Sequence, residues 1–85
     1  MFTDRPEHIT LKCQKFLVDD LADWFGLNFT VKEINEEYIE VSLMVSPSSM
    51  VYWGVQYGDN AQVIEPVYLR ERIKDMLKYI LSKYE

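Results

Sequence analysis

The residues from Tyr38 to Val45 largely alternate between apolar and polar side chains, and this pattern constrains the fold more than any other part of the sequence. Ile39, Val41 and Leu43 fall at every second position, in step with Val45. A period of two residues is typical of a β-strand that buries one face and exposes the other. The chain therefore contains at least one half-buried strand, whose apolar face another layer must cover.

Three further segments are predicted to be strands. Residues 8–13 and 27–34 alternate in the same way, and residues 35–37 between the second of these and Tyr38 have the composition of a turn. So short a link predicts an antiparallel hairpin. Ala61–Glu65 is a shorter strand that ends at Pro66, because proline has no N–H to donate to a sheet.

Apolar residues at helical spacing lie between these strands. Leu17, Leu21, Trp24 and Phe25 share one face of a predicted helix, and Gly26 follows as its C-terminal cap. This pattern predicts that all four apolar side chains pack against the sheet.

A second and a third helix are indicated further along the chain. Ser46 is expected to cap a helix in which Pro47 occupies the first position, because a proline there loses no hydrogen bond. That helix is predicted to continue through Tyr57 and to end at Gly58. From about Val67 the chain is predicted to be helical to near its end.

The predicted order β-α-β-β-α-β is the split βαβ or ferredoxin-like arrangement, followed here by an additional C-terminal helix. The fold class is therefore α+β, with a four-stranded antiparallel sheet and two helices on one face, and residues 1–85 form a single domain. The other face of the sheet is expected to be polar and to carry Thr10, Lys12, Thr30, Lys32, Glu40, Ser42 and Gln62.

The last helix brings more apolar surface than this sheet requires. Its stripe consists of Leu69, Ile73, Met76, Leu77, Ile80 and Tyr84. The stripe either packs within the chain, beside the second helix or a sheet edge, or meets a second copy or a neighbouring domain. From Val67 onward five basic and three acidic residues give +2, which leaves −7 for the rest of a chain of net charge −5. A basic helix on an acidic body favours docking within the chain or onto a complementary surface.

Charge and composition exclude several classes of protein. An acidic chain of 85 residues is not a free-standing nucleic-acid binder that works by bulk charge. Its single cysteine permits no internal disulfide bond. No apolar run approaches the roughly 18–20 residues that span a bilayer, and the first ten residues do not resemble a signal peptide. We therefore expect a small cytoplasmic domain without a membrane partner.

Candidate catalytic and metal-binding residues are few. His8 and Cys13 stand five positions apart on one strand, so their side chains are expected on opposite faces and cannot form a nucleophile–base pair. Asp19, Asp20 and Asp23 lie in a predicted helix, where acids are ordinary partners of the helix dipole. No catalytic residue, metal site or cofactor is therefore expected.

A glycine inside the second helix indicates a close approach. Gly54 lies within the segment YWGVQYG, and a glycine costs about 1 kcal/mol relative to alanine in a helix. One interpretation is a contact between helix and sheet, with Trp53 or Tyr57 in the core. The other is that one aromatic faces outward as an interface anchor. With the last helix, the candidate interface residues are Trp53, Tyr57, Ile73, Leu77, Ile80 and Tyr84.

Two lysines are the candidate ligand-binding residues. Lys12 and Lys32 are expected on neighbouring parts of the polar sheet face, where they could hold an anion. The alternative is that both are simply solvated.

The run YWGVQYGDNAQVIEPVYLRERIKDML resembles the end of bacterial WYL-domain transcriptional regulators, in the C-terminal extension called the WCX domain. The residues that match its pattern, in order, are Trp53, Gly58, Val63, Pro66, Leu69 and Arg70. The opening strand, the first helix and the hairpin fit the same domain. The resemblance implies a ferredoxin-like fold and a parent regulator that carries a winged helix-turn-helix and a WYL domain before this segment. It also implies homodimerisation and the sensing of an effector such as a nucleotide or a single-stranded nucleic acid.

Two other functions remain open on the residues alone. A ferredoxin-like domain of the ACT type would bind a small molecule for a metabolic enzyme, and the predicted element order allows this. A small enzyme on the same fold ranks last, because the chain has no recognisable acid–base pair.

Overall fold

A computed structural model describes residues 4–85. A single sheet has the strand order β2-β3-β1-β4, and every pair of neighbouring strands is antiparallel. The elements in chain order are β1 (Glu7–Gln14), a short 3₁₀ helix η1 (Lys15–Leu17), α1 (Val18–Phe25), β2 (Phe29–Glu33), β3 (Tyr38–Val45), α2 (Pro47–Gln56), β4 (Ala61–Glu65) and α3 (Val67–Ser82). This arrangement confirms the ferredoxin-like prediction and its additional C-terminal helix.

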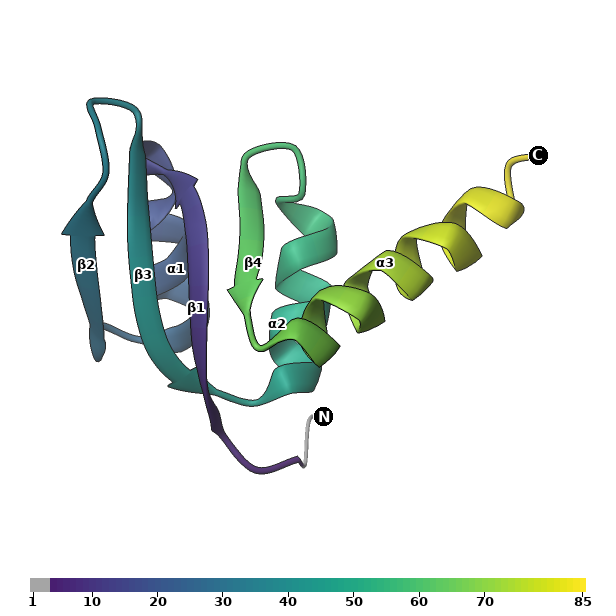
Figure 1. Cartoon of the computed structure of the whole chain (residues 1–85), viewed down its shortest axis with the longest axis horizontal. Helices are drawn as coiled ribbons and strands as arrows, with labels where there is room; N and C mark the ends of the chain where they lie inside the picture. The colour runs from purple at the N-terminus through teal and green to yellow at the C-terminus, as the bar shows by residue number, and fades with distance from the viewer. Residues whose placement is uncertain (1–3) are drawn as a thin grey trace.

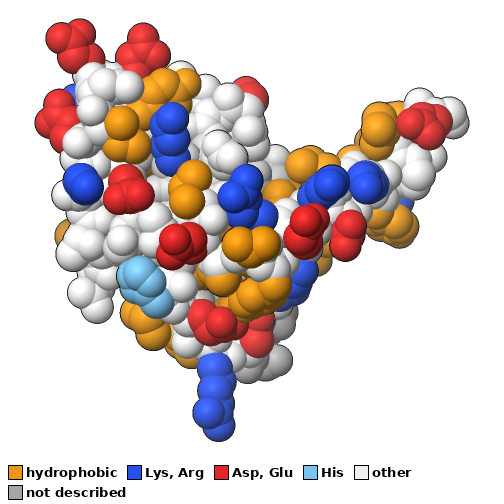
Figure 2. All heavy atoms as spheres, viewed as in Figure 1, with side chains coloured by type: hydrophobic (Ala, Val, Ile, Leu, Met, Phe, Trp, Pro, Cys, Tyr) orange, Lys and Arg blue, Asp and Glu red, His pale blue; other side chains and the backbone are white. Residues whose placement is uncertain are grey.

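The two faces of the sheet differ as the alternation predicted. Helices α1 and α2 cover one face, behind the strands in Figure 1. Strand register places the seven predicted polar residues together on the other face, where Lys12 pairs with Glu40 and Gln62, and Lys32 pairs with Glu40. Figure 2 shows charges of both signs scattered across this open face.

The core lies between the sheet and the helices. Ile9, Leu11 and Cys13 of β1 are fully buried, as is Trp53 of α2. β1 supplies so much of the core because it lies inside the sheet, between β3 and β4. The other residues of this hydrophobic core are Leu17, Leu21, Ile39, Val41, Leu43, Val45, Met50, Val51, Val63 and Leu69.

Burial was predicted wrongly near the β2 edge. β2 is shorter than predicted, and Leu27, which precedes it, is 83% exposed. Val31 and Trp24 are exposed as well. The reason is the position of α1, which lies behind β3 and β1 rather than behind β2 (Figure 1). Leu17 and Leu21 therefore reach the core, whereas Val31 has no helix above it.

The start of α2 is capped as predicted, with an additional acid. Ser46 Oγ accepts a hydrogen bond from the Ser49 amide at 3.4 Å. The Asp4 carboxylate accepts from the Ser48 amide at 3.1 Å and from the Ser48 hydroxyl at 2.9 Å, and it also accepts from the Ser46 hydroxyl. The bonds from the Ser48 and Ser49 amides satisfy groups that have no partner within the helix. The bonds from Ser46 and Ser48 to the Asp4 carboxylate hold the pKa of Asp4 below its usual 3.8.

Helix α3 is anchored at its start and projects at its end. Leu69 is fully buried and Ile73 is half-buried against α2, whereas Leu81 is 57% exposed and Tyr84, just beyond the helix, is 84% exposed. In Figures 1 and 2 the C-terminal half of α3 extends away from the body as an arm. Packing within the chain therefore accounts for only the first half of the predicted apolar stripe. Within residues 4–85, no helix has the length and apolarity to cross a membrane.

Candidate ligand groove between β4 and α3

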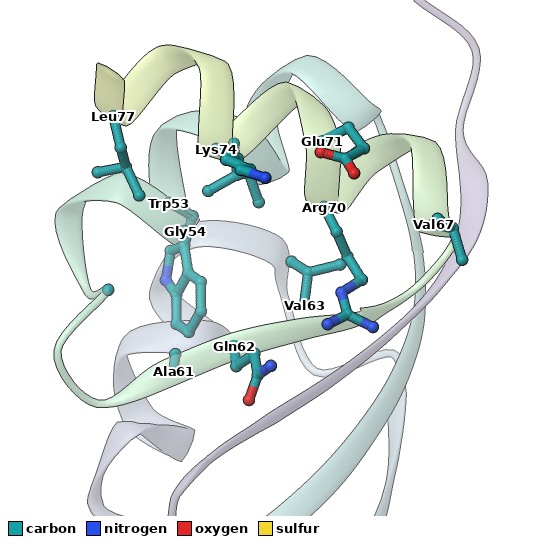
Figure 3. Close-up of a pocket in the computed structure, with 12 residues that line it drawn as sticks. Trp53, Gly54, Ala61, Gln62, Val63, Val67, Arg70, Glu71, Lys74 and Leu77 are labelled. Carbon is teal, nitrogen blue, oxygen red and sulfur yellow. The ribbon is translucent and has the colours of Figure 1, made fainter. Parts of the chain in front are cut away.

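A groove of about 590 Å³ lies where α3 diverges from β4. Strand β4 is at the edge of the sheet, so one of its sides faces this groove rather than another strand. Figure 3 shows Ala61, Gln62 and Val63 along the strand below and Arg70, Lys74 and Leu77 along the helix. The complete lining is Trp53, Gly54, Gly58, Ala61, Gln62, Val63, Val67, Arg70, Glu71, Ile73, Lys74 and Leu77.

One glycine allows α2 and α3 to approach one another, and a second allows the chain to turn closely against the end of α2. A Cβ atom on Gly54 would lie 3.0 Å from Ile73 Cδ1, which is tighter than about nine in ten real Cβ contacts. A Cβ atom on Gly58 would lie 2.9 Å from the carbonyl oxygen of Gly54. The mid-helix glycine is thus explained by the contact between α2 and α3, and not by the predicted contact between helix and sheet.

Trp53 is part of the hydrophobic core and also lines the groove. Its ring centroid lies 5.0 Å from that of Tyr57 and 6.3 Å from that of Phe25. None of the side chain is exposed, so Trp53 is not the outward-facing anchor considered as an alternative. Its Nε1 atom is buried and has no hydrogen-bond partner among the described residues. A buried donor without an acceptor is costly, and such groups are rare in folded proteins.

Three charged side chains line the groove, all from α3. Arg70 and Lys74 are four residues apart and therefore lie on one side of the helix, and Glu71 lies next to Arg70 in the chain. In Figure 3 the guanidinium of Arg70 reaches down toward β4, near Gln62. Among the described residues, neither the Arg70 side chain nor the Lys74 side chain has an ion-pair or hydrogen-bond partner.

The predicted lysine pair is not brought together. Lys12 on β1 and Lys32 on β2 both pair with Glu40 of β3, which separates them by two strand spacings, roughly 10 Å. The Nζ atom of Lys12 lies 4.8 Å from the centroid of the Tyr38 ring, where it makes a cation–π contact. Because an acid stands between the two cations, this row offers no concentrated positive charge to an anion.

The remaining interface candidates divide between α2 and α3. Tyr57 is half-buried, and Ile73 is half-buried against Gly54. Leu77 is 47% exposed, and the stripe continues through the half-buried Ile80 to Leu81 and Tyr84, beyond the part of α3 that α2 contacts. We call Ile80, Leu81 and Tyr84 the distal stripe; Ile80 and Leu81 lie on the last turns of α3, and Tyr84 continues their spacing just beyond its end.

The structure separates the residues with catalytic potential. Cys13 is buried in the core, and burial raises the pKa of its thiol to about 11. His8 lies on the open sheet face, opposite Met44. Over residues 4–85, no three acidic, histidine or cysteine side chains gather in a way that could hold a metal ion.

The groove as a site was not predicted. Arg70 was singled out for its resemblance to a family pattern, whereas Lys74, Gln62 and Glu71 were given no role. Two features of the sequence could have indicated the groove. Arg70 and Lys74 are four residues apart and so lie on the same side of one helix. Ala61–Glu65 is the last strand of a ferredoxin-like fold, in which that strand lies at an edge of the sheet. What no local pattern reveals is the angle at which α3 leaves β4.

Comparison with protein families shows a match over most of the chain. The family model described as WCX domain matches residues 5–81. Four residues of the pattern described above line the groove, namely Trp53, Gly58, Val63 and Arg70. Of the other two, Pro66 precedes α3 and Leu69 anchors it. None of the curated proteins compared with the chain matches it.

Proposed function

The chain belongs to the WCX domain family, and we propose that it serves as the effector-sensing and dimerisation domain of a helix-turn-helix transcriptional regulator. In this proposal a winged helix-turn-helix and a WYL domain belong to the same regulator, which acts in the cytoplasm. The domain itself performs no catalysis. It contributes a self-association surface and responds to a bound effector.

The observation that carries the proposed dimerisation is the exposed distal stripe. Leu81 is 57% exposed and Tyr84 is 84% exposed, on an arm of helix with nothing packed against it among the described residues. An exposed, contiguous apolar stripe on a helix is typical of a surface that meets another protein. Two copies can bury their stripes against each other about a two-fold axis, because the same surface then serves both partners.

Charge supports the same arrangement. From Val67 onward the chain carries +2, whereas the rest of the chain carries −7. The Lys78 and Lys83 side chains of the arm would therefore be attracted to the acidic body of the second copy.

Light scattering tests the proposal. At about 100 μM, where a dimer with a micromolar dissociation constant is well populated, we expect a mass of roughly twice the monomer's 10.1 kDa. Tyr84→Glu and Leu81→Glu should each return the monomer mass, because they place a charge in the middle of an apolar contact. Ile73 is a poor position for such a test, because it packs against Gly54 and its substitution would disturb folding.

Tyr79→Glu is the matched control. Tyr79 is 60% exposed and lies on the opposite side of α3 from Leu81, so this variant should remain a dimer. A wild-type chain that is monomeric at the same concentration would rule out self-association through this domain alone. The ACT-type alternative has the same element order, and the WCX match favours the regulator over it. A thermal-shift screen separates the two, since only an ACT-type domain should be stabilised by free amino acids.

A further inference from the structure

We propose that the groove between β4 and α3 binds a small, flat, apolar carboxylate. The carboxylate would lie between Arg70 and Lys74, and the apolar body would lie over the walls of the groove. This inference names the chemistry of the effector in the proposed regulatory function and rests on that function only for its biological purpose. Binding in the groove can be measured whether or not the chain dimerises.

The size and walls of the groove suit such a ligand. A cavity of about 590 Å³ falls within the range of about 300–1,000 Å³ that is usual for small-molecule sites. Its walls are mainly apolar, with Val63 on the strand and Ile73 and Leu77 on the helix. A flat ligand fits because one wall of the groove is the edge of β4 and the other is α3, and the two diverge from one another along the groove (Figure 3).

The charges at the groove select an acid over a neutral or basic ligand. Arg70 and Lys74 both line the groove, and neither is neutralised by an acid within ion-pairing distance among the described residues. Glu71 reduces the net charge of the lining to +1, which favours one carboxylate over a polyphosphate. An arginine can bind a carboxylate through two parallel hydrogen bonds, and Gln62 beneath it can donate a third.

Trp53 provides an independent indication of a ligand. Its Nε1–H is buried and has no acceptor, on a residue that lines this groove. In Figure 3 the ring nitrogen lies on the edge of the indole turned away from Arg70. Because none of the Trp53 side chain is exposed, the groove must open slightly around the ring for a ligand to reach Nε1. In this proposal a second acceptor, at the end of the ligand remote from its carboxylate, then bonds to Trp53 while Arg70 holds the acid. Supplying that acceptor removes the cost of an unpaired donor, so it adds to the affinity.

A nucleic-acid strand fits this groove less well than a small acid. The body of the chain outside α3 carries −7, which repels a polyanion. Two cations can neutralise only one or two phosphates, whereas the affinity for nucleic acid depends on several such contacts.

The probe is 6-hydroxy-2-naphthoate, a flat acid with a hydroxyl acceptor at its far end. The chain contains two tryptophans, so a ¹H–¹⁵N spectrum shows two indole signals, and Trp24 on α1 does not line the groove. We expect the Trp53 signal to move downfield during titration while the Trp24 signal stays in place. The Trp24→Phe variant assigns the two signals without altering the groove.

Charge variants test the mode of binding. Arg70→Gln with Lys74→Gln should weaken binding by about tenfold or more, because charge-assisted hydrogen bonds are lost. Arg5→Gln with Lys32→Gln removes the same charge from exposed positions outside the groove and should change the affinity by less than about twofold. The neutral 6-hydroxy-2-naphthamide should bind about tenfold more weakly than the acid.

Three results would overturn the proposal. The first is a Trp53 signal that stays fixed up to about 5 mM probe. The second is an equal loss of affinity in the two pairs of charge variants. The third is equal affinity of the chain for the amide and for the acid. Light scattering on the same samples reports dimerisation separately. If the chain dimerises but does not bind the probe, the groove proposal is wrong and the dimerisation proposal stands. If the chain binds the probe but stays monomeric, the dimerisation proposal is wrong and the groove proposal stands.

Discussion

Ile73 Cδ1 lies 3.0 Å from the point where a Cβ atom on Gly54 would stand, so α2 and α3 meet where α2 has no side chain. This contact fixes how closely the first half of α3 approaches the body of the domain. Leu69 anchors the helix one turn earlier, and beyond Ile73 the helix leaves the body. The contact between Gly54 and Ile73 therefore helps to set the width of the groove and the direction of the projecting arm.

Gly54→Ala should lower the free energy of unfolding by about 1 kcal/mol. The gain in helix propensity, about 1 kcal/mol, is smaller than the overpacking cost of about 1–3 kcal/mol that we expect at Ile73. Ile73→Val removes only the Cδ1 atom and alone should cost about 0.5–1.5 kcal/mol. In the double variant the added methyl group has room, so the two effects should offset each other by about 1 kcal/mol. Urea unfolding of the four proteins measures this coupling, and strictly additive effects would show that the two residues do not press on each other.

Asp4→Asn should lower the melting temperature at pH 7. Hydrogen bonds from the Ser46 hydroxyl, and from the hydroxyl and amide of Ser48, hold the pKa of the Asp4 carboxyl below its usual 3.8. Because this pKa is lower in the folded state, the stabilisation is present above pH 3.8 and is lost as the pH falls through the folded-state pKa. The difference between wild type and Asp4→Asn should therefore shrink in thermal melts below pH 3.8. Asp59→Asn, at an exposed acid without a hydrogen-bond partner among the described residues, is the control and should behave like wild type.

Cys13 should destabilise the fold in alkali. Burial raises the pKa of its thiol from 9.0 to about 11, so the folded state keeps the proton that the unfolded state releases. The corresponding stability is fully present below pH 9 and is lost as the pH rises towards 11, by about 2–3 kcal/mol in total. Cys13→Ala removes this titration, so its unfolding free energy should fall less steeply than that of wild type between pH 9 and 11. Identical slopes for the two proteins would mean that the thiol is not shielded from water, and rapid labelling of native Cys13 by a thiol reagent would mean the same.

The sequence predicted well those features that depend on near neighbours in the chain. Alternation within residues 38–45 and 8–13 assigned each side chain to the correct face of the sheet, because successive residues of a strand must point to opposite sides. Ser46 and Gly26 marked helix ends correctly, since capping involves only adjacent residues.

Features that depend on the placement of a whole element were predicted less well. Trp24 and Val31 fit the local apolar pattern, yet both are exposed because α1 does not lie over β2. Lys12 and Lys32 were correctly assigned to one face, but Glu40 of the intervening strand separates them. Trp53 was considered as an interface anchor, but the packing of α2 buries it completely.

The sequence by itself thus determined the element order, the two faces of the sheet and the surplus of apolar residues on the last helix, because periodicity and capping are local properties. Only the tertiary structure decided where that surplus goes. The crossing of α2 and α3 at Gly54 and Ile73 buries the first half of the stripe, opens a groove along β4 beside Arg70 and Lys74, and leaves the distal stripe exposed. The physical reason is that a crossing angle depends on which surfaces of two distant segments fit together, and no local pattern contains that information.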